Sequence, residues 1–565
     1  MPTNTGTAIR ELKIGPFAGG INRYSDISAI ADDEMTDCVN FDIDLDGSLK
    51  SRPPWHTLFA AQFTNTIGGA TPPDDFQFIL LTGTYESIRF IILRSNHTGT
   101  TGAYIYYLDG PNAGTMALIG NGAFSTAQRY GGDVFLQPDV NTTDTLTTGI
   151  KYTLSTGLVT VTTNIPRGYS SAVYKDRLWI CGRRGTPNDS RLFFSDLANF
   201  GSFPSSNFFD INPGDGDALQ DLIVYQDNLM LFKDTATYVL SYDQGPAQSV
   251  LQLVNGDVGV YGPRCVVAYE NSIFVLKYNQ VFEMVNYDFT RVSVKVPFEY
   301  DNTENTGIAS NSWLFPLWMR QCGDRLVVRF YNRLYIYHLR LRAWTRWESA
   351  DINIQGLGPI SLLDATNTQV DSKLGHNTYV APSSYRKNYD SGGVGSSGNW
   401  STYVKIFRFD DFYEGSYVED GDITPSPVDI SCKMLTKAYD VGVSHRFKRL
   451  MHWGVDTITG RTIRGIVYPF SISYKVTWGQ LHTIQWHNLN TWAYPLFAIP
   501  NTEQSQPVGA GLARRYIRFP KSLRFRLVQF EVDMLTVGNT SDGPARLYSL
   551  TAFVGGKQLV PKAVN

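Results

Sequence analysis

The chain has little cysteine, little net charge and no long apolar run, and each shortage excludes a class of protein. Its 565 residues include only five widely separated cysteines, which excludes a disulfide framework or metal-ligand spacing and predicts reduced core residues. These are Cys38, Cys181, Cys265, Cys322 and Cys432. The formal net charge of -3 gives no overall attraction to nucleic acid or anionic membranes. No stretch approaches about 18 apolar residues and no signal peptide opens the chain, so we expect no membrane span and folding in a reducing cytoplasm.

Sequence motifs of catalysis and cofactor binding are missing as well. Neither a G-x-S-x-G nucleophile elbow nor a phosphate-binding G-x-x-x-x-G-K-[ST] loop occurs. The closest histidine pairs lack the i, i+4 spacing of a helical zinc site; they are His445/His452 and His482/His487. Two carboxylate pairs have the residue types of a glycosidase, although acidic loop residues usually form turns; they are Asp215/Asp217 and Asp410/Asp411. We therefore expect no enzyme, no cofactor and no metal site.

What the chain does contain points to strands and tight turns. It has 32 Tyr, 32 Phe, 11 Trp, 50 Gly and 27 Pro, a composition typical of β-proteins. The best helix candidate is short: residues 31–38 (ADDEMTDC), with Asp32 as its cap.

Residues 40–53 (NFDIDLDGSLKSRP) resemble a calcium loop at first sight. Asp42, Asp44 and Asp46 precede Gly47, but the twelfth position, where an EF-hand needs a bidentate Glu, is Pro53. Apolar residues alternate with the aspartates, and that period of two is typical of a strand. The stretch therefore predicts a β-hairpin that turns at Gly47.

A repeat runs through the middle of the chain. Residues 172–180, 223–231 and 267–275 each combine a strand that ends in Tyr, a short polar turn and a second apolar strand. The markers, including looser copies, are Tyr85, Tyr130, Tyr174, Tyr225, Tyr269 and Cys322, with spacings of 45, 44, 51, 44 and 53 residues. Units of about 40–50 residues with several strands each are typical of β-propeller blades.

The predicted fold is therefore all-β, with three parts. Residues 61–411 form a β-propeller of six to seven blades, the seventh drawn from around 376–381 and 403–411 across the glycine-rich loop 384–400. Residues 1–60 add an N-terminal hairpin and the short helix, and residues 412–565, with longer strands, an antiparallel β-sandwich. The alternative is one large sandwich with similar hairpins.

The N-terminal segment is similar to a known family. A Gly-Gly-Ile strand, a short segment, an Asn, a turn that ends in Gly and an Arg-Pro pair follow one another; the residues are Gly19, Gly20, Asn40, Gly47, Arg52 and Pro53. Residues 193–240 and 258–267 add a matching blade pattern. Together they resemble bacteriophage tail β-propeller proteins, namely the nozzle of short-tailed phages and related tail-tip proteins.

The resemblance implies a structural virion protein of the phage tail. It implies a ring of six copies through which the genome is ejected, contacts with tail-tube or collar proteins and with fibres or tip proteins, transient contact with phage DNA, and assembly in the host cytoplasm. The alternatives are a tail-tip receptor or carbohydrate-binding protein and a glycan hydrolase. The first alternative draws on the aromatic residues Trp344, Trp347, Trp486 and Trp492.

One basic cluster stands out near the C-terminus. It consists of Arg514, Arg515, Arg518, Lys521, Arg524 and Arg526. Alternation with apolar residues places Arg524 and Arg526 on one face of a strand. The cluster is an interface with DNA phosphates or an acidic neighbouring subunit, or else a solvated outer face.

Overall fold

The chain is all-β. The computed structural model describes residues 8–347 with short gaps, the longest from 299 to 316, and little more than the strands beyond residue 347. Within this part the chain forms strands and turns and no α-helix. Accordingly, no helix there is long and apolar enough to cross a membrane. The loop 384–400 lies outside the described residues.

The repeat region forms seven antiparallel sheets, and the opening strands of the first six end at the repeat markers. The opening strands are β8 (Asp75–Tyr85), β12 (Phe124–Tyr130), β16 (Ser170–Tyr174), β20 (Leu219–Tyr225), β24 (Val266–Tyr269), β28 (Leu317–Cys322) and β32 (Leu362–Asp371). The first six end at Tyr85, Tyr130, Tyr174, Tyr225, Tyr269 and Cys322, so the sequence repeat predicted their ends correctly.

Each opening strand pairs with the next strand of its own sheet. The second strands are β9 (Ile88–His97), β13 (Asp133–Pro138), β17 (Arg177–Cys181), β21 (Asn228–Lys233), β25 (Ser272–Lys277), β29 (Arg325–Phe330) and β33 (Gly375–Pro382). The third strands are β10 (Thr100–Tyr107), β14 (Gly149–Thr153), β18 (Arg191–Phe194), β22 (Thr237–Ser241), β26 (Gln280–Val285), β30 (Arg333–His338) and β34 (Phe407–Phe409).

The fourth strands differ in origin. Six come from the same repeat unit: β11 (Met116–Asn121), β15 (Leu158–Thr162), β19 (Phe208–Asp210), β23 (Val250–Asn255), β27 (Asp288–Arg291) and β31 (Ala343–Trp347). The first sheet also gains β7 (Thr66–Ile67), which pairs with β11. In the seventh sheet the fourth strand is β6 (Trp55–Thr57), which pairs with β34. The two ends of the repeat region therefore meet in one sheet.

Tight turns join the first two strands of several sheets. Lys175 and Asp176 have φ of 49° and 53°, and Gln226 and Asp227 have φ of 46° and 59°. Positive φ at both central residues is the geometry of the type I′ turn, whose twist matches that of the flanking strands. The polar residues of the repeat are therefore turn residues.

The tyrosine that closes an opening strand ties its sheet to the next one. The Tyr174 hydroxyl donates to the carbonyl of Asp227 at 2.8 Å, and the Tyr225 hydroxyl donates to the carbonyl of Asn271 at 2.7 Å. Both rings are buried. Each acceptor lies in the first turn of the following sheet, so the same contact recurs from unit to unit.

This contact predicts a modest loss on removing one hydroxyl. Tyr225→Phe keeps the ring but leaves the Asn271 carbonyl without this donor, and we expect the free energy of unfolding to fall by about 1 kcal/mol. Urea unfolding followed by tryptophan fluorescence measures it. Tyr278→Phe, at a side chain that is 53% exposed, is the control and leaves stability unchanged. Equal losses in the two variants would contradict the role of Tyr225.

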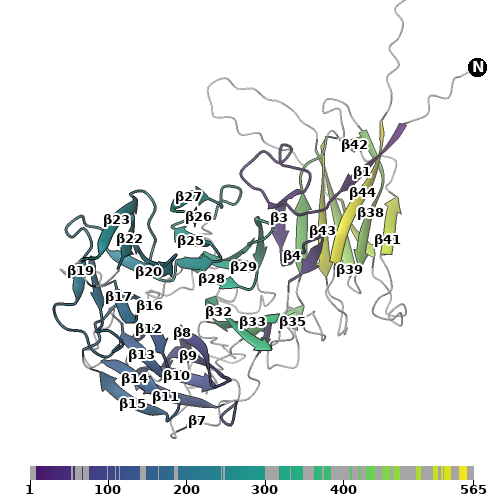
Figure 1. The fold of residues 1–565 in the computed structure, drawn as a ribbon. Coiled ribbons are helices and arrows are strands. Elements are labelled where there is room, and N and C mark those ends of the chain that lie inside the picture. Colours follow the sequence, from purple (N-terminus) through teal and green to yellow (C-terminus); the bar gives the residue numbers. More distant parts are fainter. Residues whose placement is uncertain are drawn as a thin grey trace, which may run out of the picture.

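The opening strands contact one another in sequence order. Each of β8, β12, β16, β20, β24 and β28 contacts the opening strand of the following sheet, and β32 contacts β8. Figure 1 shows these sheets following one another around a common centre in its left and lower part. The inner edges of all seven sheets therefore face the same region.

Two further sheets combine both ends of the chain. One contains β4 (Phe41–Ile43), β5 (Leu49–Ser51), β44 (Arg546–Gly556), β38 (Lys448–Ile458) and β41 (Ala513–Arg518), with β1 (Ala8–Ile14) on β44 and β42 (Arg524–Phe525) on β38. The other contains β3 (Glu34–Val39), β37 (Cys432–Thr436), β43 (Leu527–Leu535), β39 (Thr462–Phe470) and β40 (Trp492–Phe497), with β2 (Gly20–Ile21) on β3. Apart from them lies the short pair of β35 (Glu419–Asp420) and β36 (Val428–Asp429).

These two sheets share one hydrophobic core. Phe41 and Leu547 from the first sheet belong to the same buried cluster as Met434 and Phe530 from the second. The N-terminal strands β1 to β5 therefore pair and pack with strands beyond residue 431, while β6 alone pairs with the seventh sheet. The hairpin predicted from residues 40–53 is confirmed, since β4 and β5 pair in antiparallel register with Phe41 opposite Ser51.

The short helix predicted at residues 31–38 is wrong. Residues Glu34–Val39 form β3, which lies between β31 and β37. Five of its six residues are buried. If these residues formed a helix, the backbone N–H and C=O groups of β31 and β37 that face β3 would lose their hydrogen-bond partners. Pairing with these strands therefore outweighs the local helix propensity.

The sixth sheet continues into the second of these two sheets. Val39 of β3 pairs in parallel with Arg346 of β31, and the result is one ten-stranded sheet. Arg346 also forms an ion pair with Asp37 at 3.1 Å. Backbone hydrogen bonds thus cross from the repeat region into the C-terminal sheets, which fixes the two parts to each other.

Candidate functional site

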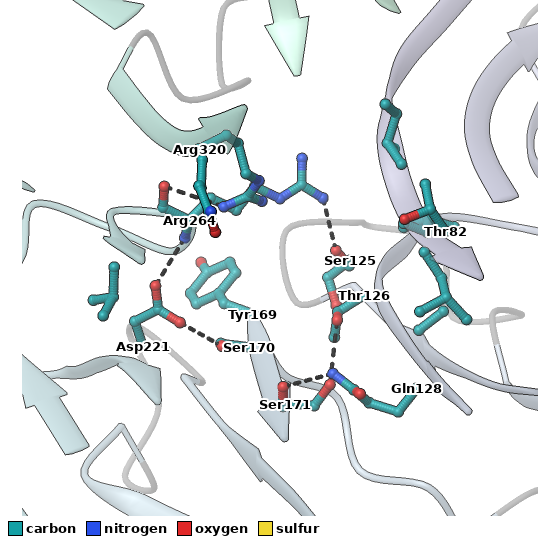
Figure 2. Close-up of a pocket in the computed structure, with 16 residues that line it drawn as sticks. Thr82, Ser125, Thr126, Gln128, Tyr169, Ser170, Ser171, Asp221, Arg264 and Arg320 are labelled. Carbon is teal, nitrogen blue, oxygen red and sulfur yellow. Dashed lines mark hydrogen bonds between the residues drawn. The ribbon is translucent and has the colours of Figure 1, made fainter. Parts of the chain in front are cut away.

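A polar cavity lies where the inner strands converge. Its volume is about 430 Å³, and residues on or next to six opening strands, β8, β12, β16, β20, β24 and β28, line it. Figure 2 shows Arg264 and Arg320 beside each other, with Asp221 and Ser170 to one side and Ser125 across the space. The cavity is therefore built jointly by the repeat units, at the centre around which Figure 1 shows them arranged.

Asp221 is the buried acid of this cavity. Its Oδ1 accepts from the Ser170 hydroxyl at 2.5 Å and from the backbone N–H of Leu222 at 2.9 Å, and its Oδ2 accepts from the N–H of Arg264 at 2.9 Å. Burial raises the pKa of Asp221, although these hydrogen bonds and the charge of Arg320 act to lower it. The carboxylate thus ties three neighbouring sheets together.

Arg264 bridges the cavity. Its Nη2 donates to the carbonyl of Ser125 at 3.1 Å, from the fifth sheet to the second. Its own carbonyl accepts from the N–H of Met319 at 2.9 Å. With a φ of 67°, Arg264 adopts a backbone conformation that non-glycine residues rarely take, and contacts on both sides hold it there.

The opposite wall carries neutral polar groups. Gln128 Nε2 donates to the carbonyl of Ser171 at 2.8 Å, and the hydroxyls of Thr126 and Ser171 lie 3.2 Å apart. Arg320 Nη1 donates to the carbonyl of Met319 at 3.2 Å. Cationic donors on one side and hydroxyls on the other can hold a small polar molecule; they do not form a nucleophile with a base.

The residues that carry the family resemblance meet at the junction between β31 and the C-terminal sheets. Asn40, with a φ of 57°, donates from Nδ2 to the carbonyl of Ser431 at 2.8 Å and from its backbone N–H to the carbonyl of Arg346 at 2.8 Å. Arg52, with no exposed surface, donates from Nε to Asn40 Oδ1 at 3.0 Å. The residues of this sequence pattern therefore connect β31 to the C-terminal sheets, and we call this region of contact the joint.

The glycines of the same pattern are required by close packing. A Cβ on Gly20 would lie 2.7 Å from both the backbone N and the backbone O of Trp344, and a Cβ on Gly47 would lie 2.6 Å from Pro16 Cβ. A Cβ on Gly19 would lie 2.7 Å from Glu34 Cγ. Pro53 lies outside the described residues.

A buried charged cluster that the sequence did not reveal lies at this joint. Asp42 on β4 forms ion pairs with Arg325 on β29 and, when its imidazole is protonated, with His338 on β30. Burial acts to raise the pKa of Asp42, but the two cationic partners outweigh it and hold that pKa well below its usual value. Asp44 instead pairs with Arg546 at 3.1 Å, and Asp46 accepts from the N–H of Ser48 at 2.8 Å. The three aspartates thus act separately.

The basic cluster is only partly described. Arg514, Arg515 and Arg518 lie on β41, opposite Asp456, Val455 and His452 of β38. Arg524 lies on β42 opposite Arg449. Lys521 and Arg526 lie outside the described residues. The cluster therefore belongs to two strands that both pair with β38, and its role as an interface stays a prediction.

Two of the four aromatic residues proposed for glycan binding, Trp344 and Trp347, are buried. Trp344 and Trp347 are 2% and 3% exposed, and their Nε1 groups donate to the carbonyls of Val292 at 3.0 Å and Phe41 at 3.3 Å. That expectation is wrong for these two residues, because both pack at the joint. Trp486 and the side chain of Trp492 lie outside the described residues.

The acidic pair that the structure describes holds a loop. Asp215 accepts from Lys233 Nζ at 2.6 Å, and Asp217 accepts from the Thr235 hydroxyl at 2.6 Å. Burial acts to raise the pKa of Asp215, but the hydrogen bond from Lys233 brings it below its usual value. Both carboxylates therefore act as turn residues here. Asp410, Asp411 and both histidine pairs lie wholly or by their side chains outside the described residues.

The cysteines follow the prediction of core residues where they are described. Cys38, Cys181, Cys265 and Cys432 are buried. Burial raises the pKa of the Cys265 thiol to about 12, which makes it unreactive. Among the described residues no group of His, Cys, Asp and Glu side chains has an arrangement suited to a metal ion.

Comparison with solved structures gives distant likenesses. No family model and no curated protein matches the chain. One similar solved structure is the extracellular domain of a one-component system from B. thetaiotaomicron, with 12% identity, a TM-score of 0.39, and coverage of 85% of this chain and 62% of that one. Another is apo AztD from Citrobacter koseri, with 9% identity, a TM-score of 0.31, and coverage of 53% and 79%. The chain thus spans less than two thirds of the first structure, and neither likeness identifies a function.

Proposed function

We propose that this chain is a structural protein of a bacteriophage tail, in which the seven sheets close into a β-propeller joined to a β-sandwich. The ring would close between β32 and β8, with β6 from the N-terminus completing the last blade. A propeller whose last blade combines strands from both ends of its sequence resists opening, because separating the blades would require breaking the pairing within that blade.

The observation that carries the proposal is the ten-stranded sheet across the joint. The resemblance to tail nozzle and tail-tip proteins rests on residues that build this joint, among them Gly20, Asn40 and Arg52. A part that bears load between tail components needs two domains that do not move against each other. The pairing of Val39 with Arg346 and the hydrogen bond from the Asn40 N–H to the Arg346 carbonyl support that property.

In this role the chain acts by assembly and catalyses no reaction. Six copies would surround the tail axis and form the nozzle through which the genome is ejected. Their partners would be tail-tube or collar proteins on one side and fibres or tip proteins on the other, with transient contact to phage DNA. The protein would be assembled in the host cytoplasm and reside in the virion.

The test is electron microscopy of the purified chain and of the phage that encodes it. We expect rings with six-fold symmetry from the purified protein, and an antibody against the chain that labels the tail tip of intact particles. A chain that stays monomeric and does not occur in virions would overturn the proposal. Binding of the monomer on a glycan array would then favour a receptor-binding protein.

A further inference from the structure

Two outer strands of the repeat region present apolar side chains to solvent. They are β15 in the second sheet and β23 in the fourth. Leu158 and Val161 on β15 are 61% and 60% exposed, and Leu253 on β23 is 59% exposed. Among the strands that the structure describes, β15 pairs with β14 alone and β23 pairs with β22 alone. Each therefore has one edge whose backbone groups face away from its own sheet.

The outer strands of four other sheets are protected in ways that these two are not. β7 covers β11, and β3 covers β31. β19 has only three residues and ends at Asp210, which pairs with Arg191 at 2.7 Å, while β27 carries Asp288 and Arg291. Cover, short length and charge are the usual means by which natural sheets keep their edges from pairing with another chain. With five and six residues and neither a charge nor a proline, β15 and β23 use none of them.

The apolar side chains of both strands continue the buried core of the sheets to their outer side. Val161 lies opposite Ile150 of β14, and Leu251 lies opposite Leu240 of β22. Ile150 and Leu240 are both buried. A strand added to either edge would place its own side chains beside Val161 or Leu251 and remove them from water. Each edge therefore suits a strand that is itself apolar and uncharged.

We propose that β15 of one copy of this chain pairs edge to edge with β23 of a second copy. Both strands are apolar and uncharged, so the contact brings no like charges together. Backbone hydrogen bonds between the two edges would join the second sheet of one copy and the fourth sheet of the other into one continuous sheet.

A second copy fits better than a different protein because the edges come in a matching pair. Figure 1 shows β15 and β23 on the outer side of their sheets, with β19 of the third sheet between them. Each copy thus offers one edge of each kind at two separate places on its surface. Head-to-tail pairing uses both edges of every copy and makes a ring where the rotation closes. The contact would join neighbouring copies in the tail, and as a part of that ring it rests on the proposed function.

Two single variants and their mixture test the contact on the full chain. Val161→Lys and Leu253→Lys each put a charge on one edge, at a side chain that is already exposed, so they oppose pairing and not folding. In sedimentation velocity we expect oligomers from the wild type. For each variant alone we expect monomers, with a dissociation constant raised at least about 100-fold.

The mixture distinguishes head-to-tail pairing from pairing between like edges. In an equimolar mixture, the intact β23 of the Val161→Lys chain meets the intact β15 of the Leu253→Lys chain. We therefore expect dimers of one copy of each variant and nothing larger. The matched control is Thr290→Lys, which puts the same charge at an exposed residue of β27, and it should assemble like the wild type.

Several results would overturn the proposal. They are a wild-type chain that is monomeric up to about 100 µM, single variants that assemble like the wild type, dimers of one variant alone, and a mixture that stays monomeric. A monomeric wild type that binds a fibre or tip protein, and loses it with Val161→Lys, would assign the edge to that protein instead. If a lysine variant does not fold, hydrogen exchange on the wild type replaces it, and assembly must slow exchange at amides of both β15 and β23.

The contact and the tail role can fail separately. If antibody labels the virion while the single variants assemble normally, the contact is rejected and the tail role stands. If the chain is absent from virions while the variants are monomeric and their mixture dimeric, the tail role is rejected and the contact stands.

Discussion

Asp42→Ala is expected to lower the free energy of unfolding by about 3–5 kcal/mol, because it leaves the partly buried Arg325 guanidinium, and the His338 imidazole when protonated, without their carboxylate at the joint. Asp42 is 4% exposed and pairs with Arg325 and His338. The loss should appear as a lower midpoint in urea or guanidinium unfolding at pH 7.

The matched control for this variant lies in the same hairpin. Asp44→Ala removes an ion pair with Arg546 whose side chains are 37% and 32% exposed, and we expect a loss below about 1 kcal/mol. Similar losses for the two aspartates would show that the buried cluster contributes little.

The loss of stability caused by Asp42→Ala depends on pH. Because the pKa of Asp42 is lowered on folding, its stabilising contribution is present above its unfolded pKa of about 3.9 and is lost as pH falls toward the folded value. The stability difference between wild type and Asp42→Ala should therefore shrink from pH 7 to about pH 3. A constant difference over that range would contradict this account.

Gly20→Ala is the second change with a large expected effect. A Cβ at this position meets the backbone of Trp344 at 2.7 Å, and backbone atoms of a central sheet cannot move aside cheaply. Its φ of 68° adds a conformational cost for any residue other than glycine.

A second glycine allows the steric cost to be measured apart from the conformational cost. Gly131 has a φ of 59°, and nothing lies within 4 Å of a Cβ added there. We expect Gly131→Ala to cost about 1 kcal/mol from conformation alone, and Gly20→Ala to cost about 1–3 kcal/mol more. Thermal and urea unfolding of both variants measure the difference. Equal losses of stability in the two variants would mean that the backbone at the joint shifts to make room for the extra methyl group.

The repeat let the sequence predict the inner strands accurately. Tyr174 and Tyr225 end their opening strands because their hydroxyls bind the next sheet and the residues after them form the turn. The closing strands carry no such marker. The seventh sheet takes β6 from residues 55–57, a pairing between ends far apart in sequence that no local pattern indicates.

Two features of the structure could not be predicted from the sequence: the strand β3 and the charged residues of the cavity. Residues 31–38 have a helix cap and few strand formers, yet β3 is a strand because two neighbours pair with it. Asp221, Arg264 and Arg320 sit at different offsets from their repeat markers, so nothing aligns them in the sequence. The sequence marks these three residues only as charged residues within or next to otherwise apolar inner strands.

The hydrogen bond from Arg264 to the Ser125 carbonyl has a consequence for how a genome would leave the particle. In the proposed tail, where the seven sheets would close into a propeller, this bond would lie across the central hole, from the fifth sheet to the second. The genome would then leave through the channel enclosed by the six copies, and each propeller would form part of the channel wall.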